Sequence, residues 1–180
     1  LSSNDLNLVN VKSIELTKLN NKRREIENLI INEINFRKIE NENKDIIIYY
    51  NTSISEGLIG IIAARLKDYF NKPSIVITKS NNILKGSARS VGNYNIGRVI
   101  KNLVDRGIII SGGGHNMAAG FTLKKNKITN FKDFILKDYL DTGLLWSNNF
   151  TYDYEVSSLA FNEDFYRDIK KLEPFGVGNP

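Results

Sequence analysis

The sequence places three consecutive glycines directly before its only histidine, in the segment SGGGH at 111–115. Glycine readily adopts positive φ and lets a ligand approach the main chain, and consecutive N–H groups in such a turn form a concave site for an anion. A tight turn between two strands, with the histidine hydrogen-bonded locally, accounts for the same residues equally well. Small residues at 118–120 indicate close packing or close backbone approach behind this segment. We predict a phosphate-holding loop formed by Gly112, Gly113, Gly114 and His115, with His115 as the candidate for an auxiliary catalytic role.

Ser87 and Arg89 stand two positions apart in the segment KGSARS at 85–90, which we predict to be a strand. Alternate side chains of a strand leave the same face, so the hydroxyl and the guanidinium converge. A phosphate can accept one hydrogen bond from the serine and a bidentate pair from the arginine, a geometry that lysine does not reproduce. We therefore predict a phosphate site here, although an edge strand with a solvated arginine explains the pattern too. Arg24, in the basic group at 22–24, is a weaker candidate, because an ordinary charged helix face explains that group as well.

The sequence has no cluster of residues that could bind a metal ion. Hydrolysis of a phosphodiester generally uses one or two metal ions held by grouped Asp, Glu or His. Here the single histidine stands among scattered carboxylates, without an Asp-x-Asp or Asp-His pairing. No Walker loop, G-x-S-x-G elbow or cysteine nucleophile is present either. The chain is therefore predicted to grip a phosphate-bearing substrate and to bind no metal or other cofactor itself.

Composition limits the class of protein. At 180 residues the chain is long enough for one full domain with flanking pieces. Its net charge of +5 favours a polyanionic partner, although a solvated lysine-rich surface would give the same charge. No apolar run approaches the roughly 20 residues of a membrane span, and residues 1–10 do not form a secretory signal, so we expect a cytoplasmic protein with no membrane partner. The missing initiator methionine suggests a fragment.

The elements that must position these residues alternate between helix and strand. The first forty residues have apolar positions at helical spacing and predict one long helix that ends near Asn41. Strands are predicted at 45–50, 74–78, 84–90, 108–110 and 118–123, and helices at 56–70, 96–104 and 131–139. The alternation indicates an α/β fold. After Gly143 the pattern changes to an aromatic alternation at 150–156 and a short helix near 163–172, which indicates the start of a further domain.

Several motifs resemble, in order, those of the RecJ family of single-stranded-DNA-specific exonucleases in the DHH phosphoesterase superfamily. They are GLIGIIAARL at 57–66, the segment 86–90, the glycine segment 112–120 and LEPFGVGNP at 172–180, and the resemblance covers residues 19–180. One departure is Ser55-Glu56, where the family often has His-Pro, so no role of that histidine is carried over.

The resemblance implies a connecting helix at 1–42, a mixed-sheet DHH-associated domain at 43–143 that binds the substrate, and the incomplete entrance of an OB-fold domain at 144–180. It also implies that the full protein degrades single-stranded DNA from 5′ to 3′ in DNA repair and recombination. The Mn²⁺ or Mg²⁺ would be held by a DHH catalytic domain ahead of Leu1, so this fragment is expected to be inactive alone. By the same resemblance, Ser87 and Arg89 grip a terminal phosphate, and the loop 112–115 closes over the scissile region.

Two other functions fit parts of the pattern. One is an oligonucleotide or cyclic-dinucleotide phosphodiesterase of the same superfamily, which normally ends soon after the DHH-associated domain. The other is a non-catalytic RNA-binding module similar to the C-terminal domain of alanyl-tRNA synthetase. The segment at 172–180 favours the RecJ-like interpretation over the first, and titration with single-stranded DNA against tRNA would separate it from the second.

Overall fold

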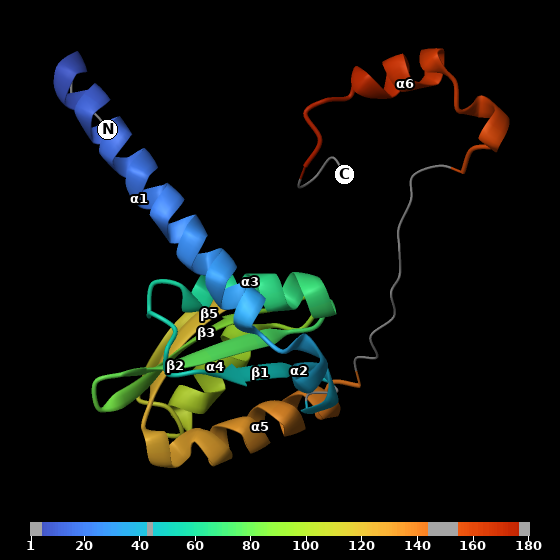
Figure 1. The fold of residues 1–180 in the computed structure, drawn as a ribbon. Coiled ribbons are helices and arrows are strands. Elements are labelled where there is room, and N and C mark those ends of the chain that lie inside the picture. The colour runs from blue at the N-terminus through green and yellow to red at the C-terminus, as the bar shows by residue number, and fades with distance from the viewer. Residues whose placement is uncertain (1–4, 43–44, 144–154, 177–180) are drawn as a thin grey trace. The chain divides into compact units, whose positions relative to one another are not determined.

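The structure, a computed structural model, describes residues 5–42, 45–143 and 155–176 and divides the chain into two compact units, Leu1–Leu145 and Trp146–Pro180 (Figure 1). The first unit is built around a five-stranded sheet in the order β1-β2-β3-β5-β4, in which β1 and β2 are parallel and the other neighbours antiparallel. The predicted mixed α/β fold is confirmed. The strands are β1 (Ile47–Tyr50), β2 (Ser74–Ser80), β3 (Ile83–Arg89), β4 (Ser111–His115) and β5 (Ala118–Leu123).

Helices cover both faces of this sheet, with α3 on one side and α5 on the other (Figure 1). On the first face, apolar residues of α3 and β2 form a buried cluster. On the second, Phe131 of α5 stacks on Phe121 of β5, with 4.6 Å between ring centroids. Each fully buried Ile, Leu or Phe contributes about 1.5 to 3 kcal/mol, so these clusters hold the sheet between its helices. The helices of the first unit are α1 (Leu6–Glu33), α2 (Phe36–Glu42), α3 (Ile59–Phe70), α4 (Ile96–Asp105) and α5 (Ile128–Asp141), with a 3₁₀ turn at Lys125–Lys127.

The long N-terminal helix is confirmed, but its predicted end near Asn41 is wrong. Helix α1 begins after the side-chain cap of Asp5 and ends at Glu33, and the backbone of the following residue, Ile34, is extended. The Asn35 side chain then accepts a hydrogen bond from the Lys38 amide, as a helix N-cap does, and α2 begins. Because Ile34 and Ile39 are both buried in the core beneath α3, the change of direction is stabilised by packing rather than by a proline or glycine.

The glycines at 112–114 form an edge strand, not a loop. Residues 111–115 are β4, which pairs with β5 so that Gly113 lies opposite Gly120. Among the described glycines, positive φ occurs at Gly92, Gly107 and Gly143 only, so the expected anion nest at 112–114 is wrong. The predicted strand at 108–110 is wrong too, although the Ile110 amide donates to the Thr122 carbonyl just before β4 begins.

Close packing explains the glycines better than backbone freedom does. An added Cβ at Gly114 would lie 2.2 Å from the Ala118 carbonyl oxygen, and one at Gly112 would lie 2.7 Å from Cγ2 of Ile100 in α4. A Cβ at Gly97 of α4 would lie 2.8 Å from the carbonyl oxygen of His115. Helix α4 therefore sits directly on the backbone of β4, at a distance that only glycine permits.

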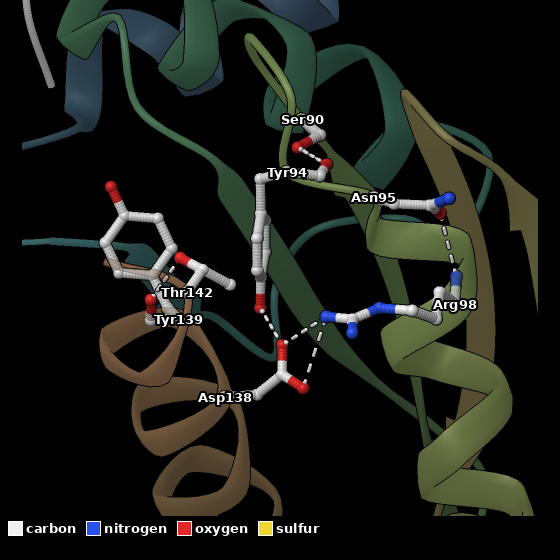
Figure 2. A network of polar contacts seen from close by, with 7 residues as sticks. All are labelled: Ser90, Tyr94, Asn95, Arg98, Asp138, Tyr139 and Thr142. Atoms are coloured by element: carbon white, nitrogen blue, oxygen red, sulfur yellow. Dashed lines mark hydrogen bonds and ion pairs between the residues drawn. The ribbon is translucent and has the colours of Figure 1, made fainter. Parts of the chain in front are cut away.

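A polar network ties the start of α4 to α5 and to the end of β3 (Figure 2). The buried Tyr94 hydroxyl donates to the Asp138 carboxylate at 3.3 Å, and Arg98 pairs with the same carboxylate at 3.1 Å. The Ser90 hydroxyl donates to the Tyr94 carbonyl at 2.6 Å. These bonds satisfy polar groups that would otherwise be buried unpaired, and they fix the segment that follows Arg89.

The second unit contains a 3₁₀ turn at Ser158–Ala160 and helix α6 (Glu163–Lys170), which Asn162 caps through its side chain. The short helix expected near 163–172 is confirmed. Most of the aromatic alternation expected at 150–156 lies outside the described residues, so the OB-fold entrance and the domain boundaries stay predictions. No helix in the described ranges is long and apolar enough to cross a membrane.

We predict opposite effects of alanine at two neighbouring glycines. Gly114→Ala should lower the free energy of unfolding by about 1 to 3 kcal/mol, because its Cβ would collide with the backbone of β5. Gly113→Ala should be neutral or stabilising by up to about 1 kcal/mol, because its Cβ would enter open space at an ordinary φ. Urea unfolding followed by circular dichroism measures both, and equal stabilities would contradict this packing.

We also predict that Tyr94 makes stability fall at alkaline pH. Burial raises the pKa of the Tyr94 hydroxyl, and the nearby Asp138 carboxylate adds to the effect. Below about pH 10 both states keep the proton, whereas above it the unfolded chain loses the proton and the folded chain retains it, so unfolding becomes easier by up to about 1.4 kcal/mol per pH unit. Tyr94→Phe should therefore lose less stability than the wild type between about pH 9 and about pH 11. Identical losses in urea unfolding would argue against it.

Candidate nucleic-acid interface

Strand β3 positions Ser87 and Arg89 by alternation. Its even-numbered residues 84, 86 and 88 are buried, and its odd-numbered residues are partly exposed on the face that α3 covers. Arg89 Nη1 donates to Ser87 Oγ at 3.1 Å and to the Ala88 carbonyl at 2.9 Å. No carboxylate among the described residues pairs with Arg89. The serine proton and the outer guanidinium N–H groups can therefore donate to an external anion.

The N-terminal turn of α3 lies over this pair. A Cβ added at Gly60 would be 3.1 Å from Arg89 Nη2 and 3.3 Å from Ser87 Oγ, so the absent side chain permits the helix to approach. The N-cap residue, Leu58, makes no side-chain capping bond. The partial positive charge at the start of the helix therefore adds to the attraction for an anion beside Arg89.

Strand register places His115 on the same face as Ser87 and Arg89. Arg89 lies opposite Ala118, which lies opposite His115, and Ser87 lies opposite Gly120, which lies opposite Gly113. Neighbouring strands are about 4.8 Å apart, so His115 stands about 10 Å from Arg89 across a floor of small residues. Added Cβ atoms at Gly113 and Gly120 would meet nothing closer than 3.9 Å. The face is open and flat between its two polar borders.

Gly112 and Gly114 do not belong to this face. By the alternation of β4 they point to the opposite side, where α4 packs against them. All three glycines also line a depression of about 570 Å³ beside α4, together with Arg98 and Lys101. The structure thus brings Ser87, Arg89, Gly113 and His115 to one face and gives the other two glycines a packing role.

Arg24 does not reach the phosphate pair. It is exposed on α1, whereas its neighbour Arg23 lines a depression of about 470 Å³ with Arg65 and Arg89. The buried carboxylate of Glu27 accepts from Arg65 Nε at 2.8 Å and from Arg23 Nη1 at 3.3 Å. Glu27 raises the pKa of Arg65 through this bond. Sequence reasoning missed this cluster.

The sequence contains a local signal for the pairing of Glu27 with Arg23 and none for its pairing with Arg65. Arg23 and Glu27 are four residues apart, a spacing that brings side chains together on a helix. Arg65 stands 38 residues further along the chain than Glu27, and only the packing of α1 on α3 joins them.

In the Ser55-Glu56 segment, the carboxylate of Glu56 has two hydrogen-bond partners. Glu56 accepts hydrogen bonds from Ser80 and from Lys85 Nζ, the latter at 2.6 Å. The pair with Lys85 is the larger cause that lowers the pKa of the Glu56 carboxyl. Lys85 shares the face of β3 with Ser87 and Arg89, so this ion pair neutralises the third polar side chain of that row.

The described residues do not fit a catalytic metal. No group of three or more His, Cys, Asp or Glu side chains in the described ranges could hold an ion. His115 has no carboxylate partner among them. Divalent cations such as Mg²⁺ and Mn²⁺ need several hard oxygen ligands, so no step of a reaction can be assigned to an ion on these residues.

Comparison with known proteins agrees with the motifs. The DHHA1 domain model matches residues 43–139. The single-stranded-DNA-specific exonuclease RecJ of Haemophilus influenzae is 29% identical over 195 residues, which cover 100% of this chain and 33% of that relative. Crystal structures of RecJ from Thermus thermophilus with Mg²⁺ and with Mn²⁺ share the fold, with TM-scores of 0.72 and 0.75, identities of 22% and 21%, and coverage of 99% of this chain and 27% and 26% of theirs.

The chain therefore spans about a third of the length of the Haemophilus relative that it matches. The match to the Haemophilus relative covers the whole chain, whereas the motifs predicted a resemblance over residues 19–180. Because the DHHA1 match covers more than half of the sequence, the chain belongs to the DHHA1 domain family, in a RecJ-like form.

Proposed function

We propose that the chain is the nucleic-acid-binding part of a 5′-to-3′ single-stranded-DNA-specific exonuclease and that it holds a terminal phosphate at Ser87 and Arg89. The observation that carries the proposal is that this pair, the small residues of β5 and β4, and His115 lie in register on one face of the sheet. The names of the similar RecJ proteins support DNA as the substrate. We propose with it a role in DNA repair and recombination in the cytoplasm.

The proposed contacts position the DNA backbone and do not read the base sequence. The phosphate is held by the Ser87 hydroxyl, the Arg89 fork and the start of α3, while the adjoining sugar and base lie over Gly120 and Gly113. His115, at the far border, can donate to or accept from the strand. A floor without large polar side chains cannot read base edges, so binding should depend on the backbone rather than on the base sequence.

Metal chemistry belongs, in this proposal, to a part of the full enzyme that lies outside this chain. The Haemophilus relative is about three times as long as this chain, and the RecJ structures similar to this chain contain Mg²⁺ or Mn²⁺. A DHH domain that carries the metal would face the floor and complete the groove. The chain would then determine which strand end enters the groove, and the metal-bearing domain would cut it.

We predict that Arg89→Ala weakens binding to 5′-phosphorylated single strands more than to 5′-hydroxyl strands. Loss of a charge-assisted bidentate contact should cost about 1.5 to 3 kcal/mol, or roughly ten- to a hundredfold in affinity. Arg89→Lys should restore only part of it, because lysine keeps the charge and loses the planar fork. Fluorescence anisotropy at low salt measures both strands with each variant.

Two results would contradict this assignment. Equal losses on both strand ends would make Arg89 a general backbone contact, and no loss on either would remove it from the site. Titration with tRNA alongside single-stranded DNA tests the competing RNA-binding function. Tighter binding of tRNA would favour that function over the exonuclease.

We also predict that the purified chain does not degrade a 5′-labelled single strand with Mn²⁺ or Mg²⁺, because no described cluster supplies the ligands. Gel electrophoresis after incubation with each metal provides the test. Metal-dependent shortening of the strand that persists through further purification would show that the chain has its own catalytic centre.

A further inference from the structure

We propose that Glu27 is a positioning residue that turns Arg23 and Arg65 into a second phosphate subsite beside the Ser87–Arg89 pair. The inference rests on the proposed function, because it assigns the next phosphodiester of the same strand to the depression that Arg23, Arg65 and Arg89 line. The depression, of about 470 Å³, is of the size that holds a small ligand, so a phosphate and its sugar can enter it.

The buried Glu27 carboxylate holds two arginine side chains in place. Its side chain is 4% exposed, and a carboxylate removed from water is costly unless it is paired and hydrogen-bonded. One oxygen accepts from Arg65 Nε and the other from Arg23 Nη1, so both arginines are held by the same group. Two long side chains from different helices thereby lose much of the freedom that an anion would otherwise have to restrict.

The held arginines still have donors to offer. Arg65 uses only its Nε toward Glu27, which leaves its two terminal nitrogens as donors, and its side chain is 62% exposed. Arg23 gives Nη1 to Glu27 and Nε to Asn20, which leaves Nη2, and its side chain is 37% exposed. A planar guanidinium anchored on one edge presents its other edge in a defined direction, as phosphate recognition requires.

The charges around the depression favour an anion. Three arginines and two carboxylates, Glu27 and Asp68, line it. Glu27 is occupied by two arginines, and Asp68 pairs with Lys67. Arg89 adds a guanidinium without a carboxylate partner among the described residues. With three guanidinium groups and two carboxylates, the lining carries one more positive than negative charge.

A simpler role for Glu27 would be to tie α1 to α3. That role needs the Arg65 bond alone and predicts a loss of stability without a change at any one phosphate. If the arginines form a phosphate subsite, their removal should cost affinity through one internal phosphodiester of the bound DNA. Replacing that phosphodiester by an uncharged linkage should then weaken binding to the wild type and not to the variants, whereas a purely structural role predicts no such difference.

The test uses 5′-phosphorylated single-stranded oligonucleotides, each with one uncharged methylphosphonate linkage at a successive position. With the wild-type chain, one internal position should weaken binding by about fivefold or more, since it removes a charge-assisted contact. With Arg65→Ala or Glu27→Gln, binding of the unmodified strand should fall by a similar factor and the effect of that position should disappear. The preference for a 5′-phosphate over a 5′-hydroxyl should persist. Arg65→Lys should recover part of the affinity.

Asp138→Asn is the matched control, because Asp138 also holds an arginine, Arg98, but on the other side of the sheet. It should leave the linkage profile as in the wild type. Thermal unfolding followed by circular dichroism checks every variant. Arg65→Ala leaves Glu27 paired with Arg23, so it decides the question if Glu27→Gln does not fold.

The outcomes separate this inference from the function on which it rests. If the wild-type chain binds single strands and Arg89→Ala removes the 5′-phosphate preference, while Arg65→Ala keeps the wild-type linkage profile, the subsite is wrong and the function stands. If Arg89→Ala has no effect or the chain does not bind DNA, the proposed function itself fails. A profile in which one linkage loses its effect only in the Glu27 and Arg65 variants supports the subsite.

Discussion

The close contact between the glycine strand β4 and its neighbours is the constraint on which the arrangement of the first unit depends. Gly112 and Gly114 meet α4 and β5 at distances that admit no Cβ, and Gly97 lets α4 lie on the end of the same strand. Helix α4 is thereby drawn to one side of the β5–β4 pair. The other side keeps its small residues exposed, so the packing of α4 against one face leaves the opposite face available for a ligand.

The orientation of Ser87 and Arg89 likewise depends on the burial of their neighbours in β3. In β3 the residues between Lys85, Ser87 and Arg89 are sealed beneath the opposite layer, where the Phe121 ring lies over Gly86. A one-residue slip of this strand would expose those positions and bury an arginine, at a large energetic cost. The direction of Arg89 is therefore determined by its neighbours' packing before any ligand arrives, which is the kind of preorganisation that recognition uses.

Sequence patterns anticipated the parts of this fold in which periodicity and burial coincide. The alternation in β3 put Ser87 and Arg89 on one face, and helical spacing located α3, α4 and α5. The glycines of β4 were mistaken for a loop because glycine has no side chain to show a strand period, and their partners became visible only through register with β5. The Glu27–Arg65 bond spans 38 residues, and no local pattern encodes such a contact.

The charged side chains on this surface are held in place by specific partners. Lys85 is paired with Glu56, so it adds no unpaired cation to the row that ends at Arg89. Arg89 is held by a hydroxyl and a carbonyl, and Arg65 by a buried carboxylate. Arginines held in these ways have fixed donor directions, whereas exposed lysines elsewhere contribute only screened attraction. If the chain binds single-stranded DNA as we propose, its recognition of that DNA should depend on where the phosphates lie more than on the net charge of +5.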